Sequence, residues 1–451
     1  MNKTIVFALI LSISSCIRGS EAPLEPYSEQ VLEKAENGDP HAQFIVGRSY
    51  YYGKGVQKNL RGAAKWFFLS AKQNYARSQN ALGMLFRDDD IESPETDREI
   101  NKATPELSFS KAKKAANQPN HLKMAVYWFM TAADNGDLRA KANIGNLYSK
   151  GIGLEQSDND AFIWWSEAAE GGLPGAQANV ATAYENGKGC AKNPSMAFEW
   201  MNKAATNDNP DEKKGIGQAQ AELGRYYYEG IGTEKNLNEV FKWATKSAEN
   251  GSPAGQYNLG NAYYLEYGTE KNIPLAVEWY QKSAAQGFEQ ALYQLGYLSE
   301  LGIGLEKSQE KAFEYYRKAA DKGNSKAQNN LANLYSKGLG VQKNEAEAYR
   351  LWLRSALQTN TIAFVNLGSC LEKGTGVKVN IPEAYRWYEK GALAGEPNAQ
   401  YKLGNCYEIG TGVEKNIYTA KQWYLKAADQ GLESAKEAVR RIENEVVLPG
   451  R

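Results

Sequence analysis

The sequence has few of the side chains that most often carry out chemistry. Its 451 residues include four cysteines and two histidines, His41 and His121. Neither histidine belongs to a cluster of cysteine, histidine or carboxylate residues with metal-ligand spacing. No nucleophile motif such as GxSxG occurs either. The sequence therefore predicts no catalytic residue, no metal site and no cofactor, and it favours a binding protein over an enzyme.

An excess of charge of one sign is also absent. The chain has 53 basic and 53 acidic residues, so its formal net charge is zero. Proteins that bind nucleic acid or anionic membranes usually present a basic field to them. We therefore expect no nucleic-acid partner and no membrane attachment through charge.

What the chain does have is a recurring pair of glycines. Gly410-Thr411-Gly412 lies just ahead of a predicted helix, where a phosphate-binding loop would place its glycines. The pair recurs at Gly53/Gly55, Gly151/Gly153, Gly187/Gly189, Gly230/Gly232, Gly302/Gly304, Gly338/Gly340 and Gly374/Gly376. Eight copies favour a structural turn over a nucleotide site, because glycine is the usual residue of tight turns.

A small residue eight positions before the second glycine fixes the period. We call it the ruler position and number each repeat from it. It falls at Gly47, Gly83, Gly145, Ala181, Gly224, Gly260, Gly296, Ala332, Gly368 and Gly404. The spacing is 36 residues in seven of the nine intervals, and the other two intervals contain insertions. Such a period is typical of a helical repeat protein.

Each repeat contains two predicted helices. The first carries the ruler residue and ends at the glycine pair. An asparagine at +12 is placed to cap the second helix, at Asn59, Asn193, Asn236, Asn272, Asn344, Asn380 and Asn416. Tryptophan at +19 and an aromatic residue at +20 follow, and we expect these rings to fill the space beside the ruler glycine. We predict that the +19 column is core rather than a ligand-stacking surface.

The pattern AxQxxLGxxYxxGxGVxxNxxxAxxWYxxAAxxG resembles the Sel-one-like repeat, a relative of the tetratricopeptide repeat. The resemblance implies an all-α fold, an α/α solenoid in which antiparallel helix pairs stack into a right-handed superhelix. It also implies a scaffold or adaptor that holds another protein, since enzymatic activity is rare in that family.

We predict four segments along the chain. Residues 1–16 form a signal peptide and possible lipoprotein leader, and residues 17–26 form a linker. Residues 27–447 form the solenoid of ten repeats with a half-repeat cap at each end, and 448–451 form a tail. The solenoid includes an insertion at 88–113, which we interpret as a mobile, partly helical excursion rather than a specific partner site.

The leader, MNKTIVFALILSISSC, has a lysine followed by an apolar run too short to span a bilayer. Its last four residues, Ile13-Ser14-Ser15-Cys16, resemble a bacterial lipobox, in which the cysteine becomes the lipidated first residue. We therefore expect an exported protein, either periplasmic or an outer-membrane lipoprotein attached through Cys16, or alternatively secreted. In the other interpretation Cys16 is removed with the leader.

The remaining cysteines do not pair. Cys370 and Cys406 lie 36 residues apart, in equivalent places of neighbouring repeats, and equivalent helices are too far apart for a disulfide. We expect both to be core residues. Exported cysteine-rich relatives have a disulfide in each repeat and some have been linked to penicillin binding, but this chain lacks their cysteine pairs.

A partner-binding surface is predicted on the first helices. Positions −3, +1 and +4 share one helical face, and the matching face of tetratricopeptide relatives lines a concave groove. The candidates are Arg48, Tyr51, Arg225, Tyr228, Tyr257, Asn261, Tyr264, Tyr293, Tyr297, Asn333, Tyr401 and Asn405. Tyrosine, arginine and asparagine suit protein recognition. Alternatively, the tyrosines pack between neighbouring first helices.

Three functions remain open at this point. The leading hypothesis is an exported scaffold that holds an unidentified protein or peptide in the groove. A second is a periplasmic immunity or inhibitor protein against a secreted toxin. The third is a β-lactam or cell-wall directed enzyme like the cysteine-rich relatives.

Overall fold

The computed structural model describes residues 25–88, 119–209 and 212–447. These residues form 22 α-helices and no strand. The predicted leader with Cys16, most of the linker, insertion residues 89–113 and the tail lie outside the described residues. None of the helices in the described part of the chain is long and apolar enough to cross a membrane.

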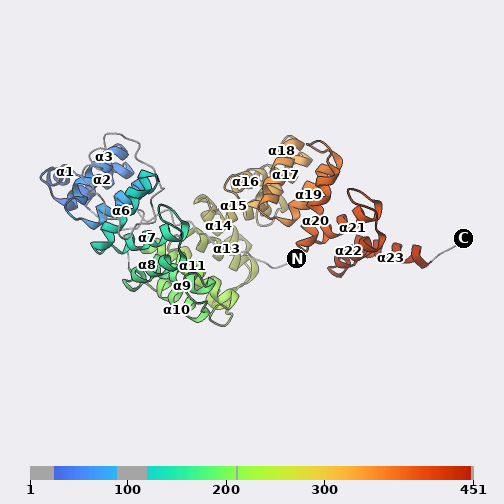
Figure 1. Cartoon of the computed structure of the whole chain (residues 1–451), viewed down its shortest axis with the longest axis horizontal. Helices are drawn as coiled ribbons and strands as arrows, with labels where there is room; N and C mark the ends of the chain where they lie inside the picture. Colours follow the sequence, from blue (N-terminus) through green and yellow to red (C-terminus); the bar gives the residue numbers. More distant parts are fainter. Residues whose placement is uncertain (1–24, 89–118, 210–211, 448–451) are drawn as a thin grey trace. The chain divides into compact units, whose positions relative to one another are not determined.

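The helices alternate as first and second members of ten pairs (Figure 1). The first helices are α2 (Pro40–Tyr52), α4 (Ala76–Arg87), α7 (Leu138–Lys150), α9 (Pro174–Asn186), α11 (Lys213–Glu229), α13 (Pro253–Leu265), α15 (Glu289–Leu301), α17 (Ser325–Lys337), α19 (Thr361–Lys373) and α21 (Pro397–Ile409). The second helices are α3 (Leu60–Ala71), α6 (Asn120–Asp134), α8 (Asp158–Glu170), α10 (Pro194–Ala205), α12 (Leu237–Glu249), α14 (Ile273–Ala285), α16 (Gln309–Asp321), α18 (Glu345–Leu357), α20 (Ile381–Leu393) and α22 (Ile417–Asp429). Helices α1 (Glu29–Glu36) and α23 (Glu433–Val447) lie at the two ends of the series.

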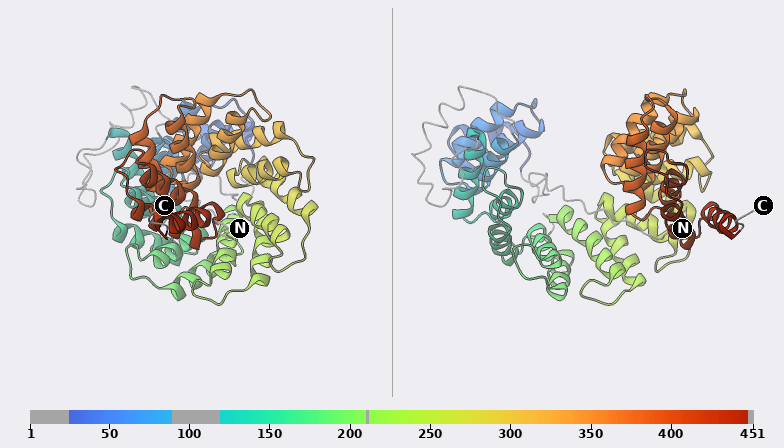
Figure 2. Two further views of the ribbon diagram at one scale, coloured as in Figure 1. Left: turned by 90° about the vertical axis from the view of Figure 1, so that its right-hand side faces the viewer. Right: turned by 45° about the vertical axis from the view of Figure 1, so that its right-hand side comes forward.

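The chain divides into two compact units. Unit 1 extends to Lys271 and contains helices α1–α13, and unit 2 begins at Asn272 and contains α14–α23. Within each unit, helices that follow one another along the chain pack against each other (Figure 2). Together with the ten matching pairs, this packing confirms the prediction of an all-α, α/α-solenoid fold.

The turns follow the predicted chemistry. The first glycine of each pair ends its helix in the left-handed conformation, as Gly53 does with φ 68°. Two first helices lack the glycine: α13 is followed by Glu266 with φ 62°, and α4 is followed by Asp88 with φ −85°. All seven predicted asparagines cap the following helix with their side-chain oxygens, for example Asn416 Oδ1, which accepts from the Thr419 amide at 3.0 Å.

The ruler glycines make close contact with the second helix, but the partner is the +20 residue rather than the +19 tryptophan. A Cβ added to Gly404 would lie 2.5 Å from Tyr424 Cε1, and one added to Gly296 would lie 2.7 Å from Tyr316 Cδ1. The same holds for Gly47 with Phe67, Gly83 with Phe129, Gly145 with Trp165 and Gly368 with Tyr388. Gly224 is different, because its +20 residue is an alanine and its nearest neighbour is Trp243 Cβ at 3.8 Å.

The prediction that the whole +19 column is core therefore needs correction. Trp128, Trp243 and Trp387 are buried, whereas Trp66, Trp164, Trp200, Trp279 and Trp423 are only partly buried. A lysine three residues later covers several of these rings, as Lys426 does over Trp423 with Nζ 4.0 Å from the ring centroid. Because +19 and +20 project about 100° apart on a helix, only one of the two can face the first helix fully.

A glutamine at −4 ties several repeats to the helix before them. Gln400 Nε2 donates to the carbonyl of Ala392, near the end of the preceding second helix. Its Oε1 accepts from Gln430 in the following turn at 2.9 Å. The first bond recurs at Gln43, Gln79, Gln177, Gln220 and Gln328. This side chain satisfies carbonyls that the end of a helix would otherwise leave without a partner.

Cys370 and Cys406 are buried and free, as predicted. Burial raises the pKa of each thiol to about 11. At neutral pH both are therefore protonated and poorly nucleophilic, because the thiolate is the reactive form.

Candidate functional site: the face of the first helices

The predicted surface, positions −3, +1 and +4 of the first helices, is here called the first-helix face. Of its twelve candidate residues, Arg225 and Asn261 are buried, with 5% and 6% exposure. The other ten are partly exposed. Neighbouring first helices contact one another directly, as α9 and α11 do in unit 1 and α19 and α21 do in unit 2. Within each unit, these contacts carry the face from one repeat to the next.

The tyrosines of the face pack mainly within their own repeats. The −3 residues Tyr293 and Tyr401 lie against the +20 tyrosines of their second helices, with ring centroids 5.8 and 5.5 Å apart. Tyr228, at +4, instead contacts Tyr267 of the next repeat, with centroids 5.3 Å apart. Packing orders each ring, yet each tyrosine stays partly exposed. These contacts are therefore compatible both with a partner-binding groove and with tyrosines that only pack between helices.

Sequence reasoning missed the carboxylates at +4. Three buried +20 tyrosines of unit 2 donate their hydroxyls to one of them: Tyr316 to Glu300 at 2.7 Å, Tyr388 to Glu372 at 2.8 Å and Tyr424 to Glu408 at 2.6 Å. Burial first, and then these carboxylates, raise the pKa of each tyrosine. The tyrosines therefore remain protonated donors. The recurrence of glutamate at +4 was visible in the sequence, but its partner sixteen positions later was not.

Three +4 carboxylates also pair with a cation from the next first helix. Glu185 pairs with Arg225, with their closest atoms 2.8 Å apart, and Glu372 pairs with Lys402 at 3.8 Å. Both terminal guanidinium nitrogens of Arg441, on α23, donate to the Glu408 carboxylate. These pairs join neighbouring repeats across the first-helix face, and they extend to the closing helix α23.

Asparagines at −2 form a second set of links that sequence reasoning missed. Asn143 Nδ2 donates to Asn80 Oδ1 at 3.0 Å, and Asn366 Nδ2 donates to Asn329 Oδ1 at 2.9 Å. Asn330 Nδ2 donates to the Tyr316 hydroxyl at 3.1 Å. Each bond connects a first helix with the preceding repeat. Recurrence of asparagine at −2 was the available signal.

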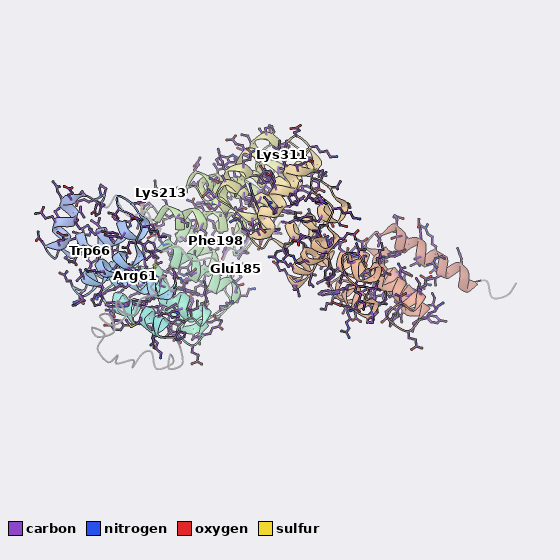
Figure 3. All side chains as sticks on the ribbon, turned by 90° about the horizontal axis from the view of Figure 1, so that it is seen from above. Arg61, Trp66, Glu185, Phe198, Lys213 and Lys311 are labelled. Carbon is purple, nitrogen blue, oxygen red and sulfur yellow. The ribbon has the colours of Figure 1, made fainter. Side chains whose placement is uncertain are left out.

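The most highly charged part of the face surrounds Arg225. Its Nε donates to Glu222 at 2.9 Å, and its terminal nitrogens donate to Glu185 and Glu229. The Tyr226 hydroxyl also donates to Glu185, which lies on α9 (Figure 3). Burial opposes ionisation of Glu185, but the bonds from Arg225 and Tyr226 prevail and lower its pKa. Burial dominates at Glu222 and raises its pKa.

These groups suit recognition better than catalysis. The described part of the chain holds no group of three or more histidine, cysteine or acidic residues that could bind a metal ion. The buried +20 tyrosines Tyr316, Tyr388 and Tyr424 have raised pKa values, so they resist acting as bases near neutral pH. What remains is a set of ordered rings, amides and paired charges that can contact a polypeptide.

Comparison with known proteins identifies the family to which this repeat belongs. The Sel1 repeat matches ten segments, residues 40–75, 113–137, 138–173, 174–209, 217–252, 253–288, 289–324, 325–360, 365–396 and 397–432. The chain belongs to the Sel1 repeat family. The number of matched segments, ten, equals the number of ruler positions in the sequence. Three stretches between 40 and 432 fall outside them: residues 76–112, 210–216 and 361–364.

Several solved structures of Sel1 repeat proteins are similar to the chain. A protective antigen of uropathogenic Escherichia coli with an SLR fold is 30% identical, over 92% of this chain and 90% of that chain, with a TM-score of 0.48. A Sel1 repeat protein from Oxalobacter formigenes is 31% identical over 56% of this chain and 96% of that chain, with a TM-score of 0.48. An immunity protein from Pseudomonas aeruginosa is 21% identical over 52% of this chain and 85% of that chain, with a TM-score of 0.33.

Proposed function

We propose that this Sel1 repeat protein is an exported scaffold that binds a protein or peptide along its first-helix face. The family is generally non-enzymatic and typically serves protein interaction. The observation that supports the site is the repetition of partly exposed tyrosine, asparagine and arginine at −3, +1 and +4. Rings already held by packing lose little entropy when a partner binds.

The hydrogen-bond links between repeats support the same proposal. The asparagine bonds and the pairs formed by Glu185, Glu372 and Glu408 fix the spacing of adjacent first helices. A partner that contacts several repeats needs that spacing to be constant, because its contacts are then formed without reordering the scaffold.

Photo-crosslinking in the native cell tests the location of the site. A benzoylphenylalanine at Tyr297, on the face of α15, is expected to give a discrete adduct with the partner. The same probe at Tyr418, which is 79% exposed on the second helix α22, serves as the control and is expected to give none. Adducts from Tyr418 alone would place the partner on the second helices.

Export and lipid attachment are tested separately. Wild-type protein is expected in the membrane fraction with an acylated Cys16, whereas Cys16→Ala should remain unacylated. Unmodified wild-type protein in the soluble periplasm would contradict the lipid anchor and leave export intact. Protein retained in the cytoplasm with its leader uncleaved would contradict export itself.

A further inference from the structure

One edge of unit 2 carries three exposed aliphatic side chains, here called the edge patch: Leu357, Ile362 and Leu393. They are 69%, 57% and 73% exposed. Leu357 ends α18 and Leu393 ends α20, both at +25, and Ile362 lies in the first turn of α19 between them in the chain. On this edge the end of a second helix lies beside the start of its first helix, since Ser355 Oγ donates to the Ser325 carbonyl at 2.7 Å.

The edge patch departs from the repeat around it. At +25 the other repeats have Lys72, Asp134, Glu170, Thr206, Glu249, Ala285, Asp321 and Asp429. No other repeat has a leucine or isoleucine at the position of Ile362. The Sel1 repeat match also omits residues 361–364. The turn between Leu357 and Ile362 holds Thr359 with φ 63°, where seven other repeats have glycine. A β-branched residue is strained in this conformation.

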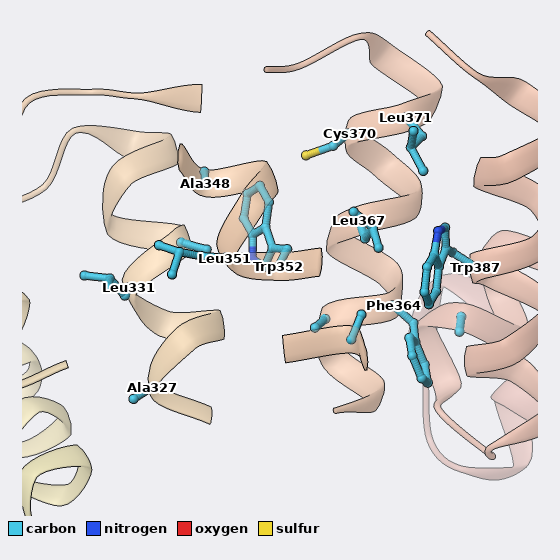
Figure 4. Close-up of a cluster of buried hydrophobic side chains, with 14 of the residues drawn as sticks. Ala327, Leu331, Ala348, Leu351, Trp352, Phe364, Leu367, Cys370, Leu371 and Trp387 are labelled. Carbon is cyan, nitrogen blue, oxygen red and sulfur yellow. The ribbon is translucent and has the colours of Figure 1, made fainter. Parts of the chain in front are cut away.

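The edge patch does not serve the core beneath it. Phe364, Leu367, Trp352 and Trp387 already fill the interior of α18–α20 (Figure 4). The side chains of the edge patch point outward and gain little from folding, because their apolar area stays in water. An exposed apolar cluster of this kind is typical of an interaction site.

Basic side chains surround the edge patch. Arg354 and Lys390 lie one turn before Leu357 and Leu393 on the same helices, and both are exposed. Three more exposed lysines lie at the same edge, Lys318 and Lys322 of repeat seven and Lys326 of repeat eight. None of the five is in a salt bridge with another residue that the structure describes. Two acidic residues offset part of this positive charge, Asp321 and Glu396. The Glu396 carboxylate already caps the N-terminus of α21.

We propose that the edge patch docks an amphipathic helix of a protein partner whose polar side is acidic. Leu357 and Leu393 lie one repeat apart, and a repeat spans roughly 8–10 Å. Leucines seven residues apart on a helix are separated by about 10.5 Å, which matches that span. Acidic side chains beside the leucines would meet Arg354 and Lys390. This site is separate from the first-helix face and does not depend on the proposed function.

The test uses the full chain and a labelled synthetic helix of 18 residues, roughly five turns, with a leucine stripe and glutamates elsewhere. A matched peptide carries lysine in place of every glutamate. Fluorescence anisotropy should show binding of the acidic peptide, weakened by added salt, and about tenfold weaker binding of the basic peptide. A double variant, Leu357→Glu with Leu393→Asp, takes residues that other repeats have at +25. It should bind the acidic peptide at least roughly tenfold more weakly.

Ile409→Glu is the matched control, because Ile409 is 72% exposed on α21 but lies at +5, away from the edge patch. It should leave binding unchanged. Equal binding of both peptides, or full binding by the double variant, would overturn the proposal. The proposal would also be overturned if the acidic peptide failed to bind the wild-type chain while that chain formed a dimer, or bound phosphatidylglycerol vesicles, and the double variant did neither. Those results would assign the edge patch to a second copy or to a membrane.

Discussion

Arg225→Met is expected to lower the free energy of unfolding of unit 1 by about 3 kcal/mol, the lower end of the range for a buried ion pair, because it leaves partly buried carboxylates without their cation. Arg225 is 5% exposed and bonds to Glu185, Glu222 and Glu229. Methionine keeps much of the aliphatic length, so loss of packing adds little. In a repeat protein the damage should remain near α9–α12, where hydrogen exchange measures it.

The loss in Arg225→Met should be larger at pH 7 than in mild acid. Glu185 has a lowered pKa in the folded protein, so its contribution is present above its unfolded pKa and is lost as pH falls through its folded pKa. Removing Arg225 removes that contribution. Glu222 has a raised pKa, so its contribution to stability has the opposite sign: its ionisation already lowers the stability of the fold as pH rises. Without Arg225 that opposition grows, so both carboxyls make the variant weaker at neutral pH.

Arg350→Met is the matched control for this prediction. Arg350 also bonds to a glutamate, Glu347, with its Nη2 2.7 Å away, but its side chain is 64% exposed. Water screens such a pair, so the control should change stability little. Equal losses for the two arginines, or a loss that does not depend on pH, would contradict the role assigned to the Arg225 cluster.

Gly404→Ala should destabilise the last repeat by about 1–3 kcal/mol, the usual cost of overpacking. The new Cβ would lie 2.5 Å from Tyr424 Cε1. The ring cannot move aside cheaply, because its hydroxyl is held by Asn405 and Glu408. Thermal unfolding with exchange data for α21 and α22 measures the effect.

Gly224→Ala makes the same change at the same ruler position but meets its nearest neighbour at 3.8 Å, an ordinary contact. It should be neutral, or stabilising by up to about 1 kcal/mol from helix propensity. If both alanine variants behaved alike, the ruler glycines would not be explained by the +20 rings.

The periodic features of the fold were predictable from the sequence because each has a local cause. The asparagine caps and left-handed glycines depend on neighbours within a few residues, so their pattern specifies their structure. The choice between +19 and +20 depends on the angle at which two helices meet. The sequence contains both aromatic columns and does not indicate which one faces Gly404 or Gly296.

The polar network was less predictable for a similar reason. Glu372 looks like an ordinary surface glutamate until its partners Tyr388 and Lys402 are brought to it by two other helices. The twelve candidate residues were found by helical spacing alone. Spacing assigns them to one helical face, but it did not reveal that Arg225 and Asn261 are buried there.

The proposed function depends most on the first-helix face as the binding surface. The most direct measurement is the affinity for the partner crosslinked from Tyr297, compared between wild type and a double variant, Tyr297→Ala with Asn333→Ala. Both residues are partly exposed at +1 of neighbouring repeats. Tyr418→Ala is the control. We expect at least a roughly tenfold loss of affinity in the double variant, with its melting temperature little changed and the control unaffected. Wild-type affinity in the folded double variant would contradict the proposed function.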